Sequence, residues 1–122
     1  MPAKQPKWLP DVQEKNYPAA TFYLTLLLPT KDVETIIDKL KAAPLCQFKA
    51  KDIFRASQLS LLGVSNSHVE NDRQKIKDGA ALSPILLVRD ASNGRVIVAD
   101  GYHRLCAVYG FDEDAWIPCK IV

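Results

Sequence analysis

The clearest hydrophobic pattern in the chain lies between residues 30 and 43. Val33, Ile36, Ile37 and Leu40 recur at helical spacing, so their side chains share one face of a helix. A threonine or an aspartate can cap the first turn, and a proline follows the last residue. The pattern predicts an amphipathic helix that packs against the rest of the chain.

The segment before this helix fits two structures. Residues 18–28 start with a proline, which suits the first turn of a helix, and Pro29 stops the segment. Alanine and leucine favour a helix here, whereas Phe22–Leu26 would also fit a strand. We expect the helix. Its large apolar side chains either pack on the following helix or form a contact face for a second copy of the chain in a homodimer.

Short strands and helices alternate from residue 46 onward. The composition predicts, in order, a strand over 46–50, a turn or short helix over 52–55, a loop over 63–67 and a polar helix over 68–78. Ser67 is placed to cap the polar helix, and Gly79 is placed to end it.

The strongest hairpin signal in the chain is Asn93-Gly94. It separates two continuous apolar runs, over 85–88 and 95–99, which read as buried strands. Strands joined by so short a turn must be antiparallel neighbours.

A helix over 102–109 follows the second of these strands, and Gly110 is expected to end it. The last strand, over 117–122, contains Pro118, which has no N–H group to donate to a neighbouring strand. We therefore expect this strand at an edge of the sheet.

Together these elements predict an α/β, or α+β, fold with a small mixed sheet. The expected main domain is 46–122, on which residues 1–45 pack as an arm and helices. Residues 1–16 are rich in proline and lysine and predict an irregular arm. Trp8 in this arm is expected to dock on the body, because a large indole ring gains from burial.

Composition narrows the class of protein. The 16 basic and 14 acidic residues leave a net charge of +2, which disfavours nucleic acid as a partner. Cys46, Cys106 and Cys119 are far apart, so we expect free thiols in a reducing cytoplasm, with the last two in the core. No apolar run is long enough for a signal peptide or a membrane span.

The candidate chemistry lies in the turn Asp100-Gly101-Tyr102-His103-Arg104. A buried strand ends there, a glycine permits a sharp bend, and a helix begins. The first N–H groups of a helix have no internal partner and, with the helix dipole, attract anions. The guanidinium of Arg104 can donate hydrogen bonds to two phosphate oxygens at once. His103 can donate a hydrogen bond to phosphate or transfer a proton. We predict that Gly101, Tyr102, His103 and Arg104 bind phosphate or a nucleotide.

Two carboxylates are candidates for catalysis. Asp100 is placed for a metal ion, a ribose hydroxyl or a general-base role. Glu70 is the second candidate, because phosphoryl transfer requires a group that orients or deprotonates the acceptor hydroxyl. Asp72 begins the same helix and is its alternative, and a solvated helix face would account for both.

Simpler roles stay open for the residues of the turn. Asp100 can be only a helix cap, Arg104 can pair with the acidic run 112–114, and His103 can be structural. A set of four zinc ligands can also be drawn from His68, His103, Cys106 and Cys119. The close ligand pairs of a structural zinc site are absent, so we expect no structural metal.

These residues resemble the ParB/sulfiredoxin fold superfamily over 48–122. The resemblance rests on the turn, on the preceding Ser-Pro-Ile-Leu-Leu-Val-Arg strand and on the closing Ile-Pro-Cys-Lys-Ile-Val strand. ParB-type partition proteins bind a nucleoside triphosphate at a Gly-x-x-Arg turn, which Gly101-Tyr102-His103-Arg104 matches. Sulfiredoxin has its nucleophilic cysteine where this chain has Tyr102, so sulfiredoxin activity is not expected. The free-serine kinases of this fold carry Asp-Gly-His-His-Arg, which differs from this turn by one residue.

The resemblance implies ATP or CTP with magnesium as the ligand. It implies phosphoryl transfer to an unknown small molecule or hydrolysis of the nucleotide, with cytoplasmic location. ParB proteins continue into a helix-turn-helix domain that reads DNA, and we expect no such part in these 122 residues. The alternatives are a non-enzymatic binding or regulatory protein of the same fold and a DNA-associated ParB-like protein.

Overall fold

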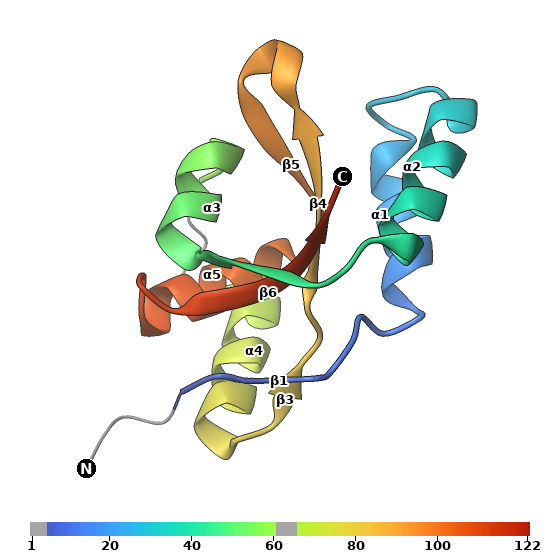
Figure 1. Cartoon of the computed structure of the whole chain (residues 1–122). Helices are drawn as coiled ribbons and strands as arrows, with labels where there is room; N and C mark the ends of the chain where they lie inside the picture. The colour runs from blue at the N-terminus through green and yellow to red at the C-terminus, as the bar shows by residue number, and fades with distance from the viewer. Residues whose placement is uncertain (1–4, 61–65) are drawn as a thin grey trace.

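The computed structural model describes residues 5–60 and 66–122 (Figure 1). The chain is mixed α+β. Its helices are α1 (Asn16–Leu24), α2 (Thr30–Ala42), α3 (Ala50–Ser57), α4 (Ser67–Asp78) and α5 (Tyr102–Phe111). Its strands are β1 (Lys7–Trp8), β2 (Cys46–Lys49), β3 (Ala81–Leu82), β4 (Ile85–Asp90), β5 (Arg95–Asp100) and β6 (Trp116–Ile121).

Four of the strands form one sheet in the order β2-β6-β4-β5. β4 and β5 are antiparallel, which confirms the hairpin prediction. A 3₁₀ turn over Ala91–Asn93 joins them, and Gly94 follows in the left-handed conformation. β6 is parallel to β4 and antiparallel to β2, so the sheet is mixed, as predicted.

The predicted edge position of the last strand is wrong. β6 lies between β2 and β4, in the interior of the sheet. Its pairing with β4 begins at Cys119, one residue after Pro118. On its other side Pro118 pairs with Gln47 of β2, so β6 carries a proline inside the sheet although proline has no N–H group to donate.

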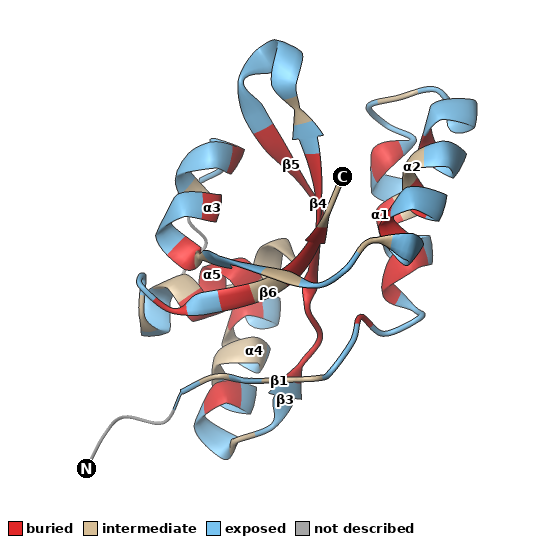
Figure 2. Ribbon diagram, viewed as in Figure 1, coloured by how far each residue is buried: buried red, intermediate tan, exposed pale blue. Residues whose placement is uncertain are grey.

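Helices cover both faces of the sheet. Leu86 and Val88 point to one face and share a core with α1 and α2, whereas Ile85 and Leu87 alternate to the other face and share a core with α3, α4 and α5. Figure 1 shows the two layers on opposite sides of β4, and Figure 2 shows buried residues concentrated along that strand. β4 is therefore common to both cores.

The first two predicted helices are confirmed. α2 buries Val33, Ile37 and Leu40, three residues of the predicted stripe. The segment before it is helical, so the strand alternative is wrong. Phe22 and Leu26 are 77% and 81% exposed, and these two side chains do not pack on α2 as one interpretation expected.

Two helix ends differ from the prediction. Asn66 caps α4, because its side-chain oxygen accepts from two N–H groups of the first turn, and Ser67 is already the first helical residue. Residues 63–65 of the predicted loop lie outside the described residues. Gly79 ends α4 in the left-handed conformation, as predicted, but α5 continues through Gly110.

The N-terminal arm is more regular than predicted. Lys7 and Trp8 form a strand parallel to β3, and Trp8 packs against the core, which confirms that this ring docks on the body. Ser83, just before β4, donates to the buried side chain of Asn16 at 2.7 Å and accepts from the N–H of Gln13 at 3.1 Å. The residues before α1 are thus tied to the central part of the fold.

A buried lysine joins β6 to the layer of α1 and α2. Lys120 Nζ donates to the carbonyl oxygen of Lys41 at 3.0 Å and lies 3.7 Å from the carboxylate of Asp11. Its side chain is only 8% exposed. Because Lys41 lies in the last turn of α2, the ammonium group meets both an unpaired carbonyl and the negative end of the helix dipole.

We expect Lys120→Met to lower the free energy of unfolding by about 1–3 kcal/mol, because the Lys41 carbonyl loses a charged donor while most apolar contacts are kept. Urea unfolding followed by circular dichroism measures the change in the midpoint urea concentration. The dependence of the free energy on urea concentration should stay the same. Lys31→Met, at an exposed position of α2, is the matched control and should change the free energy by less than about 0.5 kcal/mol. Equal midpoints for the two variants would contradict a stabilising role for Lys120.

Candidate functional site

The predicted strand, glycine turn and helix are present at the end of β5. Asp100 ends the strand, Gly101 has φ of 106°, and α5 begins at Tyr102. A Cβ atom on Gly101 would lie 2.4 Å from Ile85 Cγ2 and 3.0 Å from Arg104 Nη2. The turn therefore requires glycine for two reasons, its backbone conformation and the close packing of Ile85 and Arg104 on either side of it.

Arg104 pairs with the carboxylate at the end of β5. Its Nη2 lies 3.0 Å from Asp100 Oδ2 and donates to the carbonyl oxygen of Pro84 at 3.5 Å. Both charged side chains are 16% exposed. The alternative in which Arg104 pairs with residues 112–114 is wrong. The cap alternative for Asp100 is also wrong, because Gly101 holds the cap position and no side chain caps α5 in the described part of the chain.

The N-terminal ends of two helices meet at this turn. His68 and His103 are each the second residue of a helix, α4 and α5, and their ring centroids lie 4.8 Å apart at an interplanar angle of 39°. The ring of Tyr102 lies 5.7 Å from that of His103, and its hydroxyl donates to the carbonyl oxygen of Ser60. Two imidazoles and Arg104 thus lie where both helix dipoles are positive.

The electrostatics of the cluster follow from this crowding. Burial lowers the pKa of His103, and the neighbouring His68 and Arg104 lower it further, against the opposing effect of Asp72 and Asp100. Burial raises the pKa of Asp72, although Lys75, Arg104 and His103 favour its charged form. His103 is consequently mostly neutral at pH 7 and can accept or donate a hydrogen bond there.

Of the two carboxylates considered on α4, Asp72 is the one whose pKa is affected by residues of the turn. Lys75, 3.9 Å from the Asp72 carboxylate, favours its charged form most, and Arg104, His103 and His68 do so as well. Glu70 instead lies 3.8 Å from Arg73 Nε, and Arg73 reaches the far end of α5 at Gly110. The sequence names both carboxylates as candidates and favours Glu70, and the direction of each side chain depends on how α4 packs against α5.

A hollow of about 390 Å³ opens beside the turn. It is lined by Ala19, Tyr23, Leu59, Val98, Ala99, Asp100, Gly101, Tyr102 and His103. It contains three of the four predicted phosphate-binding residues, and Arg104 is not among the residues that line it.

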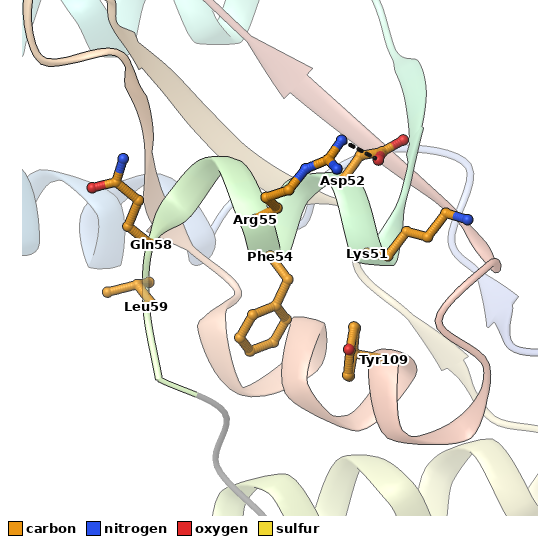
Figure 3. A pocket seen from close by; sticks show the side chains of 7 residues that line it. All are labelled: Lys51, Asp52, Phe54, Arg55, Gln58, Leu59 and Tyr109. Atoms are coloured by element: carbon orange, nitrogen blue, oxygen red, sulfur yellow. Dashed lines mark hydrogen bonds and ion pairs between the residues drawn. The ribbon is translucent and has the colours of Figure 1, made fainter.

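A larger hollow of about 820 Å³ lies between α3 and α5 (Figure 3). Phe54 and Tyr109 form its apolar floor, with ring centroids 4.8 Å apart. The guanidinium of Arg55 is 3.3 Å from Asp52, and the ammonium of Lys51 is 2.7 Å from Asp114. Both of these cations are paired with carboxylates, and none of the predicted phosphate-binding residues lines this hollow.

Metal ligands do not gather in the described residues. No group of three or more histidine, cysteine, aspartate or glutamate side chains there could hold an ion. Cys106 and Cys119 are buried in the core, as predicted.

No protein-family model matches the chain, and no curated protein or solved structure matches it. Among the described helices, none has the length and apolar composition needed to cross a bilayer.

We expect Gly101→Ala to lower the free energy of unfolding by about 3 kcal/mol or more, because the methyl group would overlap Ile85 and the backbone conformation is strained for alanine. Gly94→Ala is the matched control. Gly94 also has a positive φ, 62°, but open space lies around its Cβ position, so only about 1 kcal/mol of backbone strain should remain. Thermal unfolding of both variants makes the comparison, and equal losses would show that close packing at Gly101 contributes nothing.

We expect His103 to titrate below the ordinary histidine pKa of about 6.5. Asp72→Asn should lower the His103 pKa further by removing a carboxylate, and His68→Gln should raise it by removing a neighbouring cation. NMR of the ring protons measures both shifts, and the chain has only two histidines to assign. Because the unfolded chain binds this proton more readily, His103 should also reduce stability as the pH falls below about 6.5.

Asp38→Asn, at an exposed position on α2, is the control for this titration and should leave the His103 pKa unchanged. A His103 pKa that is the same in the Asp72 and His68 variants as in the parent chain would contradict the electrostatic cluster.

Proposed function

We propose that the start of α5 binds the phosphate groups of a nucleotide. The observation that carries the proposal is the meeting of two helix N-termini, where His68, His103 and Arg104 gather and α5 has no side-chain cap in the described chain. The positive ends of two helix dipoles attract an anion, and Arg104 and the imidazoles can donate hydrogen bonds to it. A phosphate would supply that anion.

The difference between the two helix starts supports this position. At α4 the side chain of Asn66 accepts hydrogen bonds from the N–H groups of His68 and Val69. At α5 the cap residue is Gly101, which has no side chain to offer. The first N–H groups of α5 therefore suit an external acceptor with several oxygens.

In the proposed complex Arg104 keeps its contact with Asp100. Both of its assigned acceptors, Asp100 and the carbonyl of Pro84, use Nη2, and the buried Nε has no acceptor among the described residues. The remaining N–H groups of the guanidinium are the ones we assign to phosphate. Asp100 fixes the orientation of the group that binds.

We extend the proposal to phosphoryl transfer, with Asp72 as the base. Burial raises the pKa of this carboxyl, which brings it closer to the range in which a carboxylate accepts a proton from a hydroxyl group or water. The resemblance of the turn to the nucleotide-binding branches of the ParB/sulfiredoxin superfamily supports ATP or CTP as the nucleotide. Magnesium would arrive with the nucleotide, because this ion is usually held by phosphates and one or two carboxylates.

A non-enzymatic phosphate-binding protein is the second candidate function. The ion pair between Asp100 and Arg104 favours it, because a paired carboxylate is a poor metal ligand and a poor base. The same residues would bind phosphate in both candidate functions. A measurement of turnover therefore distinguishes the enzyme from the binding protein.

We expect ATP or CTP with magnesium to raise the melting temperature of the chain, since a ligand at about 100 times its dissociation constant adds about 2.7 kcal/mol to the free energy of unfolding. The same melting measurement is made with ADP and with GTP. Arg104→Ala and His103→Gln should each weaken binding about tenfold or more, because charge-assisted hydrogen bonds contribute about 1.5–3 kcal/mol. Isothermal titration calorimetry measures these affinities.

Arg55→Ala is the matched control, because it removes an exposed arginine from the larger hollow and should leave the affinity unchanged. Equal affinity in the Arg104, His103 and parent chains would refute the proposed site. The release of ADP from ATP in the same samples identifies an enzyme, and binding without release supports the second candidate.

A further inference from the structure

Cys46 and Cys119 lie 73 positions apart in the sequence and side by side in the sheet. They are direct partners in the antiparallel pairing of β2 with β6. Their Sγ atoms are 3.8 Å apart, and the thiol of Cys46 also lies 3.4 Å from the carbonyl oxygen of Cys119 as a donor. The two thiols are thus in contact on one face of the sheet.

This placement matches the requirements of a disulfide bond. Directly opposed residues of antiparallel strands have Cα atoms about 4.5–5.5 Å apart, and disulfides join cysteines at about 4.4–6.8 Å. Rotation of the side chains can bring the sulfurs together while the strands stay paired. We propose that Cys46 and Cys119 form a reversible disulfide that joins β2 to β6. This inference is independent of nucleotide binding.

The two thiols differ in access, and this sets the order of the reaction. Cys46 is half-buried, whereas Cys119 is fully buried. Burial, followed by the neighbouring Cys46, raises the pKa of the Cys119 thiol, so it ionises less readily than an exposed thiol. Cys46 therefore reacts first with an external oxidant and Cys119 second.

With oxidised glutathione as the oxidant, the reaction is two thiol–disulfide exchanges. The Cys46 thiolate attacks one sulfur of oxidised glutathione, and one glutathione thiolate leaves. Cys119 then loses its proton and attacks Cys46 Sγ in the mixed disulfide, which expels the second glutathione thiolate. The protein is oxidised by two electrons, and both glutathione sulfurs are reduced.

The disulfide would act on the attachment of β2 and α3. β2 is an edge strand whose partner in the sheet is β6, and it leads directly into α3. The start of α3 is held by hydrogen bonds from Ala50 and Lys51 to the carbonyls of Ala115 and Glu113, both at 2.9 Å. A covalent link between β2 and β6 would prevent this edge from separating, and it would restrict the unfolded chain.

The test is oxidation of the folded chain in excess oxidised glutathione. The chain should lose two of its three free thiols, and peptide mapping should recover a fragment that links Cys46 to Cys119. The oxidised chain should melt at a higher temperature than the reduced chain, and dithiothreitol should reverse the shift. Three persisting thiols, or a stable glutathione adduct on Cys46, would overturn the proposal.

Cys106 supplies the control, because it is buried in the core on α5. Cys106→Ala should still form the link, whereas Cys46→Ala should abolish both the link and the shift in melting temperature. Because Cys46 is only half-buried, that variant keeps the experiment decisive even if Cys119→Ala fails to fold. A disulfide that includes Cys106 would also overturn the proposal.

Discussion

The close approach of Ile85 to the backbone of Gly101 determines how the candidate site is built. Ile85 belongs to β4, the strand shared by both cores, and is fully buried. Because Gly101 has no side chain, Ile85 packs directly beneath the first residue before α5, and Arg104 lies 3.0 Å from the same position. The guanidinium then reaches Asp100 and Pro84, at the ends of the two strands of the hairpin. A single missing methyl group thus fixes the direction in which α5 leaves the sheet and, with it, the place where His103 meets α4.

The electrostatics at this point run against the stability of the free protein. Helices are stabilised by acidic residues in the first turn, and α4 has Glu70 there, whereas α5 has none. Arg104 adds positive charge to the positive end of α5, and burial, followed by the neighbouring His68 and Arg104, lowers the pKa of His103. Asp72 on α4 is half-buried and burial raises its pKa, so it offsets this charge only in part. Among the described residues, the buried Nε of Arg104 has no acceptor, and the proposed anion would meet this turn where the helix dipoles favour negative charge.

The sequence predicts those features that depend on neighbours along the chain. The stripe of α2, the hairpin and the glycine turn are encoded by spacing and by residue type, and each was found where expected. Features that depend on how distant segments pack were missed. Nothing near Pro118 reveals that β6 lies in the middle of the sheet, and the contact between Cys46 and Cys119 depends on that same strand order. Asp72 interacts with the turn because of the way α4 packs on α5, which charge and helical spacing alone do not determine.

The ion pair between Asp100 and Arg104 bears directly on which anion the proposed site would select. A ligand that approaches Arg104 finds a guanidinium already bound to a carboxylate, so its gain is the difference between the two interactions and not the full strength of a new one. A singly charged anion with one or two oxygens resembles the carboxylate already present and would gain little by joining it. A phosphate carries more charge and three acceptor oxygens, which can contact the open N–H groups of α5, an imidazole and the guanidinium at the same time. In the proposed site Asp100 would therefore disfavour weak anions more than phosphate, and this competition for Arg104 would give the site its selectivity.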